Sequence, residues 1–231
     1  MQLDMTSARE SLRSLAASQG WLKPILRTVG DARCRAWDLV HGVDTCGDLP
    51  LLKLNFENEH KTRGLEYQSH HPSIIRAGLN LLQIRHQDYT FVDFGCGKGR
   101  VMLVASEFPF RRIIGVEFAP PLAELARQNI RMYRAQNQKC REIEAITVDA
   151  AEYELAAEPQ VLYFYSPFAR QVMDRVVQNI EESLRSSPRD MLVLFSGILP
   201  MRDAAFGSRP GFERLHRGRY MDLYRHRKML Q

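Results

Sequence analysis

Short apolar runs alternate with amphipathic segments through the middle of the chain, and this alternation limits the possible folds more than any other feature. Each apolar run is long enough for one buried strand, and each amphipathic segment is long enough for one helix. The predicted strands are residues 90–94, 112–117, 143–148, 161–165 and 191–196, and the predicted helices are residues 100–108, 121–136 and 169–185. This order predicts an α/β fold with a parallel, doubly wound sheet.

The two ends of the chain follow other patterns. Residues 212–217 and 220–225 are strand-like and are separated by Gly218-Arg219, which predicts a C-terminal antiparallel hairpin and brings the sheet to seven mostly parallel strands. Residues 1–66 predict a helical N-terminal extension, which could serve as a lid, a substrate contact or a dimer contact. The α/β domain is then expected over residues 67–231.

The composition is that of a globular protein, with 231 residues, 45% of them hydrophobic and 26% charged. The net charge of +5 is carried by residues 201–231, which hold 8 basic and 3 acidic side chains. With Phe212, Tyr220 and Tyr224 nearby, this tail permits an RNA-binding interpretation. Arginines on a hairpin, however, usually face solvent and protect a sheet edge, and we favour that interpretation.

Membrane, metal and disulfide classes find no support in the sequence. No run approaches the roughly 20 apolar residues that cross a bilayer, and the first residues lack the apolar core of a signal peptide. We expect a soluble, cytoplasmic protein without a membrane partner. The four cysteines form no C-x-x-C pair and the histidines no H-E-x-x-H motif, so we expect reduced thiols and no metal site.

The segment from Phe91 to Arg100 is the most informative one for function. An apolar strand ends near Asp93, and three alternating glycines then lead into a helix, at the edge where open α/β sheets bind ligands. A phosphate-binding Walker loop is weakened because Lys98 is followed by Gly99 and no first glycine matches, and a dinucleotide fingerprint is weakened because Arg100 stands where its third glycine would be. A tight turn without a ligand is the structural alternative.

The second strand ends at Glu117, 24 residues after Asp93. An acidic side chain at the tip of this strand can accept hydrogen bonds from ribose hydroxyls. A carboxylate two residues before the glycines suits a cationic ligand better than a pyrophosphate. The pair therefore predicts a nucleoside ligand that carries positive charge.

The motifs DFGCGKGR, GVEF and VDAAEY resemble those of class I S-adenosylmethionine-dependent methyltransferases. The resemblance implies a Rossmann-like methyltransferase domain over residues 67–231, with S-adenosylmethionine as cofactor and S-adenosylhomocysteine as product. It implies that Gly95, Cys96 and Gly97 line the methionine and ribose portions, that Asp93 lies near the amino group, that Glu117 binds the ribose diol, that Phe118 flanks the adenine, and that Asp149 and Ala150 meet the adenine edge. Core packing of Phe118 and helix capping by Asp149 are the alternatives.

A narrower resemblance comes from FVDFGCGKGRV with GVE, together with the upstream WDLVHGVDTCGD and EYQSHHP. These segments are similar to bacterial relatives of the non-SET protein-lysine methyltransferases. The resemblance implies that Tyr67 and His70 cover the cofactor, although this pattern often has Thr at the second position. A surface loop is the alternative for both residues.

The fourth strand leads into Ser166-Pro167-Phe168, which resembles the Asn/Asp-Pro-Pro-aromatic motif of amino-methylating members of the fold. The resemblance implies that Tyr165, Ser166, Pro167 and Phe168 form the catalytic edge, where polar groups orient the acceptor nitrogen. Burial among aromatic rings would lower the pKa of an acceptor lysine. Tyr165, His70 and Glu66 are candidates for a general base.

Three functions follow as hypotheses. The leading hypothesis is methylation of a protein side chain, with lysine as the favoured residue. Methylation of a small molecule at oxygen or nitrogen is the alternative, and RNA binding or RNA methylation is a further one. Because Ser166 is shorter than the usual Asn, a noncatalytic cofactor-binding module also stays open. The sequence leaves the acceptor and the oligomeric state undetermined.

Overall fold

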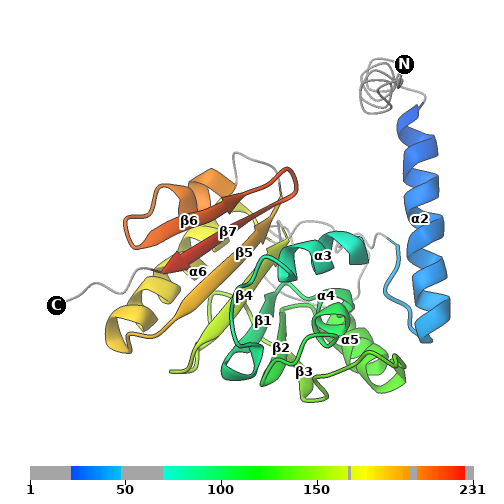
Figure 1. Cartoon of the computed structure of the whole chain (residues 1–231), viewed down its shortest axis with the longest axis horizontal. Helices are drawn as coiled ribbons and strands as arrows, with labels where there is room; N and C mark the ends of the chain where they lie inside the picture. The colour runs from blue at the N-terminus through cyan, green and yellow to red at the C-terminus, as the bar shows by residue number, and fades with distance from the viewer. Residues whose placement is uncertain (1–21, 48–69, 166–167, 198–201, 227–231) are drawn as a thin grey trace, which may run out of the picture.

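The computed structural model describes residues 22–47, 70–165, 168–197 and 202–226, with side chains from residue 32 onward. Its centre is one seven-stranded sheet in the order β3-β2-β1-β4-β5-β7-β6 (Figure 1). The first five strands are parallel, and β7 pairs antiparallel with both β5 and β6. The strands are β1 (Thr90–Phe94), β2 (Arg112–Glu117), β3 (Ile143–Thr147), β4 (Gln160–Tyr165), β5 (Met191–Ser196), β6 (Phe212–Arg217) and β7 (Met221–His226). The predicted α/β class, strand number and C-terminal hairpin are confirmed.

Helices cover both faces of the sheet. On one face, α3 (Pro72–Leu79), α4 (Arg100–Ala105) and α5 (Pro120–Met132) pack through residues such as Ile75, Met102 and Ala126. On the other face, α6 (Arg170–Ser186) buries Val177 and Ile180 against β1, β4 and β5, and the short π-helix η3 (Asp203–Gly207) joins this cluster. The strands read as continuous apolar runs because side chains on both faces are buried.

Two helices end earlier than the sequence predicts, because distant segments bind their last backbone groups. The Ser106 carbonyl accepts hydrogen bonds from the backbone N–H groups of Lys139 and Cys140, so α4 ends at Ala105 instead of residue 108. The N–H of Arg134 donates to the His41 carbonyl, and α5 ends at Met132 instead of residue 136.

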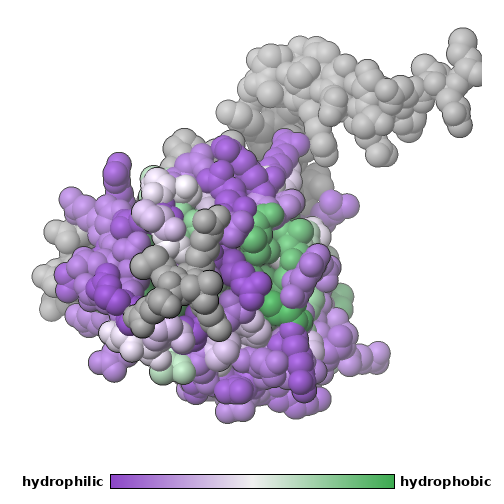
Figure 2. Space-filling model, turned by 60° about the vertical axis from the view of Figure 1, so that its left-hand side comes forward, coloured by the Kyte–Doolittle hydropathy of each residue, from purple (hydrophilic) through white to green (hydrophobic). Residues whose placement is uncertain are grey.

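Helix α2 (Leu22–His41) stands beside the layer formed by α3, α4 and α5 (Figure 1). The N-terminal extension is therefore helical over these residues, whereas Glu66 and Tyr67 lie outside the described residues. None of the described helices is long and apolar enough to span a membrane. The face of the molecule in Figure 2 is mostly hydrophilic, with one apolar area bordered by polar side chains.

Strand order reverses at β1. The chain goes from β1 to β2 and β3 on one side, and then returns to place β4 and β5 on the other. Loops that follow β1 and β4 therefore leave the same edge in opposite directions, and they open a crevice at which α/β sheets bind ligands. The glycine-rich turn and Tyr165, the residue before the predicted acceptor motif Ser166-Pro167-Phe168, both lie at this edge.

Candidate cofactor and acceptor site

The turn after β1 is held open by two glycines in the left-handed region, Gly95 with φ of 77° and Gly97 with φ of 54°. The N–H groups of Gly95 and Cys96 donate to the Val116 carbonyl at 2.9 and 3.1 Å, which ties the turn to β2. Glycine adopts these dihedral angles without steric cost, and it leaves space for a ligand beside the backbone. The sequence thus produces a rigid, open turn between β1 and α4.

Glu117 closes the neighbouring end of β2. Its side chain is 3% exposed, and its two carboxylate oxygens each accept a backbone N–H, from Gly97 and from Ala119, both at 2.9 Å. Burial raises the pKa of the Glu117 carboxyl to about 7, although backbone donors oppose the shift. Glu117 is therefore fixed against the glycine turn and titrates near neutral pH.

Asp93 lies beside this turn with an unsatisfied oxygen. Its side chain is 2% exposed, and its Oδ2 has no hydrogen-bond partner within the described residues. Burial, and then the nearby Glu117 charge, raise the pKa of Asp93 well above its usual range. A buried carboxylate oxygen without a donor is uncommon in a finished protein interior, and it indicates that a ligand donor belongs there.

These groups fit the portions of S-adenosylmethionine that the resemblance assigns to them. An ammonium group would supply the donor that Asp93 lacks, and ribose hydroxyls would donate to Glu117. Phe118 is partly exposed directly after Glu117, and its predicted position beside the adenine stays a prediction. Asp149 accepts the Ala151 N–H at 2.8 Å in a turn instead of capping a helix, and the adjacent Ala150 is buried.

Cys96 is buried between this turn and β2. Burial raises the pKa of its thiol well above the ordinary value, so it stays protonated and packs as an apolar group. A Cβ at Gly115 would lie 2.3 Å from the Met102 sulfur and 2.7 Å from the Cys96 sulfur. Gly115 is therefore needed for close packing under the turn, a role that the sequence motif alone does not disclose.

On the other side of the crevice, His70 joins the ends of β4 and β5. Its Nδ1 lies 2.6 Å from the Tyr163 hydroxyl, its Nε2 lies 3.5 Å from Ser196 Oγ, and its ring stacks on Tyr165 at 4.1 Å. Burial, followed by the charges of His71 and Arg100, lowers the pKa of His70 to about 3, so the ring is neutral. These contacts of His70 are with β4 and β5, and its predicted contact with the cofactor stays a prediction.

Of the predicted acceptor residues, the structure describes only Tyr165 and Phe168. Ser166 and Pro167 lie outside the described residues. Tyr165 is partly exposed at the end of β4, whereas Phe168 is 7% exposed and packs in the cluster with α6. The roles of Ser166, Pro167 and Phe168 in acceptor binding stay predictions.

Residues 92–187 match a family model described as a methyltransferase domain. The chain carries an S-adenosylmethionine-dependent methyltransferase domain. No curated protein matches the sequence. The match begins within β1 and ends just after α6, and it includes the glycine turn, Glu117 and Tyr165.

Several solved structures are similar to the chain over about two thirds of its length. An RNA methyltransferase from Salinibacter ruber in complex with S-adenosylhomocysteine has 18% identity and a TM-score of 0.46, covering 68% of this chain and 92% of its own. A ribosomal protein L11 methylase from Lactobacillus delbrueckii subsp. bulgaricus has 17% identity and a TM-score of 0.45, covering 67% and 77%. The magnesium protoporphyrin IX methyltransferase from Synechocystis PCC 6803, with bound S-adenosylmethionine, has 12% identity and a TM-score of 0.44, covering 66% and 75%.

Two basic residues of the methyltransferase domain connect the glycine turn to the N-terminal segment, and sequence reasoning missed both. Lys98 Nζ donates to the Cys46 carbonyl at 2.9 Å and pairs with Asp44 at 3.2 Å. The buried Arg100 donates to Thr45 Oγ1 at 2.6 Å and pairs with Asp38 at 2.8 Å. The sequence does show that Lys98 and Arg100 each follow a glycine directly. Their acidic partners, however, lie more than 50 positions upstream, so local patterns could not identify the pairs.

One part of the RNA-binding interpretation of the C-terminal hairpin is wrong. Phe212 and Tyr224 were candidate stacking surfaces, but both are buried in the cluster around Phe206. They cannot stack on bases because alternate strand positions point into the core. Tyr220, in the turn, is exposed.

Proposed function

We propose that the protein transfers a methyl group from S-adenosylmethionine to the side-chain nitrogen of a lysine in a protein acceptor. The cofactor supplies an electrophilic methyl group on a sulfonium. The chain then has to position a neutral amine beside this methyl group and exclude water. The observation that carries the lysine assignment is the uncharged aromatic edge at the end of β4, where the partly exposed Tyr165 ring stacks on the neutral His70 ring.

An uncharged aromatic edge favours the neutral form of a lysine. Desolvation disfavours the ammonium, so the pKa of an entering lysine falls and its nitrogen lone pair becomes available. Because burial lowers the pKa of His70 to about 3, His70 is a poor acceptor for that proton, and the proton leaves to solvent. The function of His70 in this proposal is to hold the Tyr163 hydroxyl and the Tyr165 ring in place.

The cofactor side of the proposal assigns a binding contact to each group at the glycine turn. Asp93 accepts from the amino group, Glu117 accepts from the ribose hydroxyls, and the backbone of Gly95 to Gly97 follows the ligand. Phe118, Asp149 and Ala150 surround the adenine. The unpaired oxygen of Asp93 supports this assignment, because the donor it lacks is one that the methionine portion provides.

The test is transfer of tritium from methyl-labelled S-adenosylmethionine to a lysate that is then separated into protein, RNA and small-molecule fractions. The proposal predicts label in the protein fraction and N-methyl-lysine after acid hydrolysis. Label confined to the small-molecule fraction would replace it with the small-molecule alternative. Label in RNA, or no label from a protein that binds S-adenosylhomocysteine, would also overturn it.

A further inference from the structure

Five arginines around the C-terminal hairpin are neutralised within the domain. Each has a carboxylate within 4 Å, on η3, α6 or a neighbouring strand or loop. The pairs are Arg202 with Asp222, Arg209 with Asp174 and Glu181, Arg214 with Asp203 and Asp222, Arg217 with Asp203, and Arg225 with Asp190. The surplus of basic residues therefore leaves little free positive charge within residues 202–226, the part of this tail that the structure describes.

Arg219 is the exception among the arginines of residues 202–226. In that described stretch it has no carboxylate at ion-pair distance, and its guanidinium lies over the Tyr220 ring, 5.2 Å from the centroid. Tyr220 itself is 53% exposed. The turn between β6 and β7 thus presents one cation that has no carboxylate partner in residues 202–226 and that an aromatic ring holds in place.

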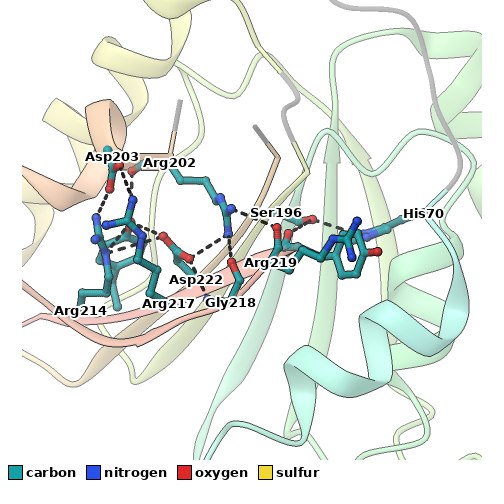
Figure 3. A network of polar contacts seen from close by, with 11 residues as sticks. His70, Ser196, Arg202, Asp203, Arg214, Arg217, Gly218, Arg219 and Asp222 are labelled. Carbon is teal, nitrogen blue, oxygen red and sulfur yellow. Dashed lines mark hydrogen bonds and ion pairs between the residues drawn. The ribbon is translucent and has the colours of Figure 1, made fainter. Parts of the chain in front are cut away.

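The turn that carries Arg219 and Tyr220 is held in place by a buried arginine. Arg202 is fully buried, and its guanidinium donates to the carbonyls of Gly218 at 2.9 Å and Arg219 at 3.2 Å while it pairs with Asp222 at 2.8 Å (Figure 3). Asp222 in turn accepts the Gly218 N–H at 3.2 Å. Hydrogen bonds from the buried Arg202 to the carbonyls of this exposed turn make the turn rigid. A rigid turn can hold a recognition side chain in one position.

The turn also lies at the acceptor edge. Because β7 runs antiparallel to β5, the β6–β7 turn is next to the carboxyl end of β5, where Met221 pairs with Ser196. Ser196 Oγ donates to the Tyr220 carbonyl at 2.8 Å and lies 3.5 Å from His70 Nε2 (Figure 3). Ser196 and His70 thus connect the Tyr220 backbone to the Tyr165 ring.

We propose that Arg219 and Tyr220 bind a carboxylate on the methyl acceptor, so that the enzyme selects lysines that are flanked by acidic residues. This inference rests on the proposed function, since it names the sequence context of the lysine. Charge complementarity supports it, because a guanidinium that is held in place and has no carboxylate partner among the described residues attracts a carboxylate as the acceptor docks. Tyr220 adds apolar contact area and limits the freedom of the Arg219 side chain.

The test compares two fluorescein-labelled lysine peptides of equal length, one with Glu and one with Gln on both sides of the lysine, bound to the protein with S-adenosylhomocysteine present. Anisotropy should show about threefold tighter binding of the Glu peptide, as expected for one exposed ion pair. Arg219→Gln should remove the preference, and Arg219→Glu should reverse it. Arg217→Gln, an exposed hairpin arginine already paired with Asp203, is the matched control and should keep it.

Added salt should shrink the preference, because it screens exposed charges. Equal binding of both peptides by the wild type, or an unchanged preference in Arg219→Glu, would overturn the inference. An RNA oligonucleotide that binds more tightly than the Glu peptide and depends on Arg219 would also overturn it. If the lysate assay labels no protein but the Arg219-dependent preference persists, the lysine assignment fails and the carboxylate site stands.

Discussion

Cofactor affinity should fall as pH decreases through neutrality, because Glu117 must be ionised to accept hydrogen bonds from both ribose hydroxyls. Burial raises the pKa of this carboxyl to about 7 in the ligand-free protein. Ribose donors stabilise the carboxylate, so binding lowers that pKa and releases a proton. Cofactor affinity is therefore highest above pH 7 and decreases as the pH falls below 7.

The size of the effect follows from the fraction of ionised Glu117. With a pKa of about 7, roughly nine tenths is ionised at pH 8 and roughly one tenth at pH 6, so the dissociation constant of S-adenosylhomocysteine should rise about tenfold between them. This ratio corresponds to about 1.4 kcal/mol. Asp93, whose pKa burial also raises, can steepen the dependence further.

The assay is isothermal titration calorimetry with S-adenosylhomocysteine at pH 6, 7 and 8, in two buffers that differ in ionisation enthalpy. It should report release of close to one proton per ligand at pH 6. Glu117→Gln should weaken binding and lower the pH dependence, whereas Glu124→Gln, an exposed carboxylate on α5, should change neither. An affinity that varies less than twofold from pH 6 to 8, or an unchanged slope in Glu117→Gln, would refute the reasoning.

Three further outcomes are expected. Arg202→Met should lower the unfolding free energy in urea by about 3 kcal/mol, because it leaves Asp222 buried without its main counter-charge, and a loss below 1 kcal/mol would contradict this. His70→Phe should cost about 1–3 kcal/mol by removing the Tyr163 partner. It should also reduce the loss of stability that wild type shows as pH falls from about 6.5 toward 3, where the unfolded chain but not the folded protein binds a proton at His70. Phe168→Ala should reduce kcat for methyl transfer more than affinity for S-adenosylhomocysteine, and equal reductions would argue for packing alone.

The sheet could be predicted from the sequence because its strands are buried on both faces. β1, β2 and β5 have the predicted bounds, since a continuous apolar run ends where burial ends. The helix ends were less accessible, because Ser106 and Arg134 bond to segments far away in the chain. Local patterns carry no information about such partners.

The cofactor side of the site was visible for a similar reason. Three glycines and two strand-end acids are local features, and the structure brings Gly97 and Glu117 into direct contact. Arg100 and Arg219 were not assigned a role in the site, because what matters for each is the presence or absence of a distant carboxylate. The number of charged residues can be read from the sequence, but the ion pairs that they form cannot.

Equilibrium dialysis of radiolabelled S-adenosylmethionine tests the cofactor site most directly. Wild-type protein should bind one equivalent. Gly97→Arg should bind none, because a long side chain would fill the space beside the turn, while Gly47→Arg, at a left-handed glycine whose Cβ has open space, should bind normally. Normal binding by Gly97→Arg, or no binding by the folded wild-type protein, would contradict the placement of the cofactor at this edge of the sheet.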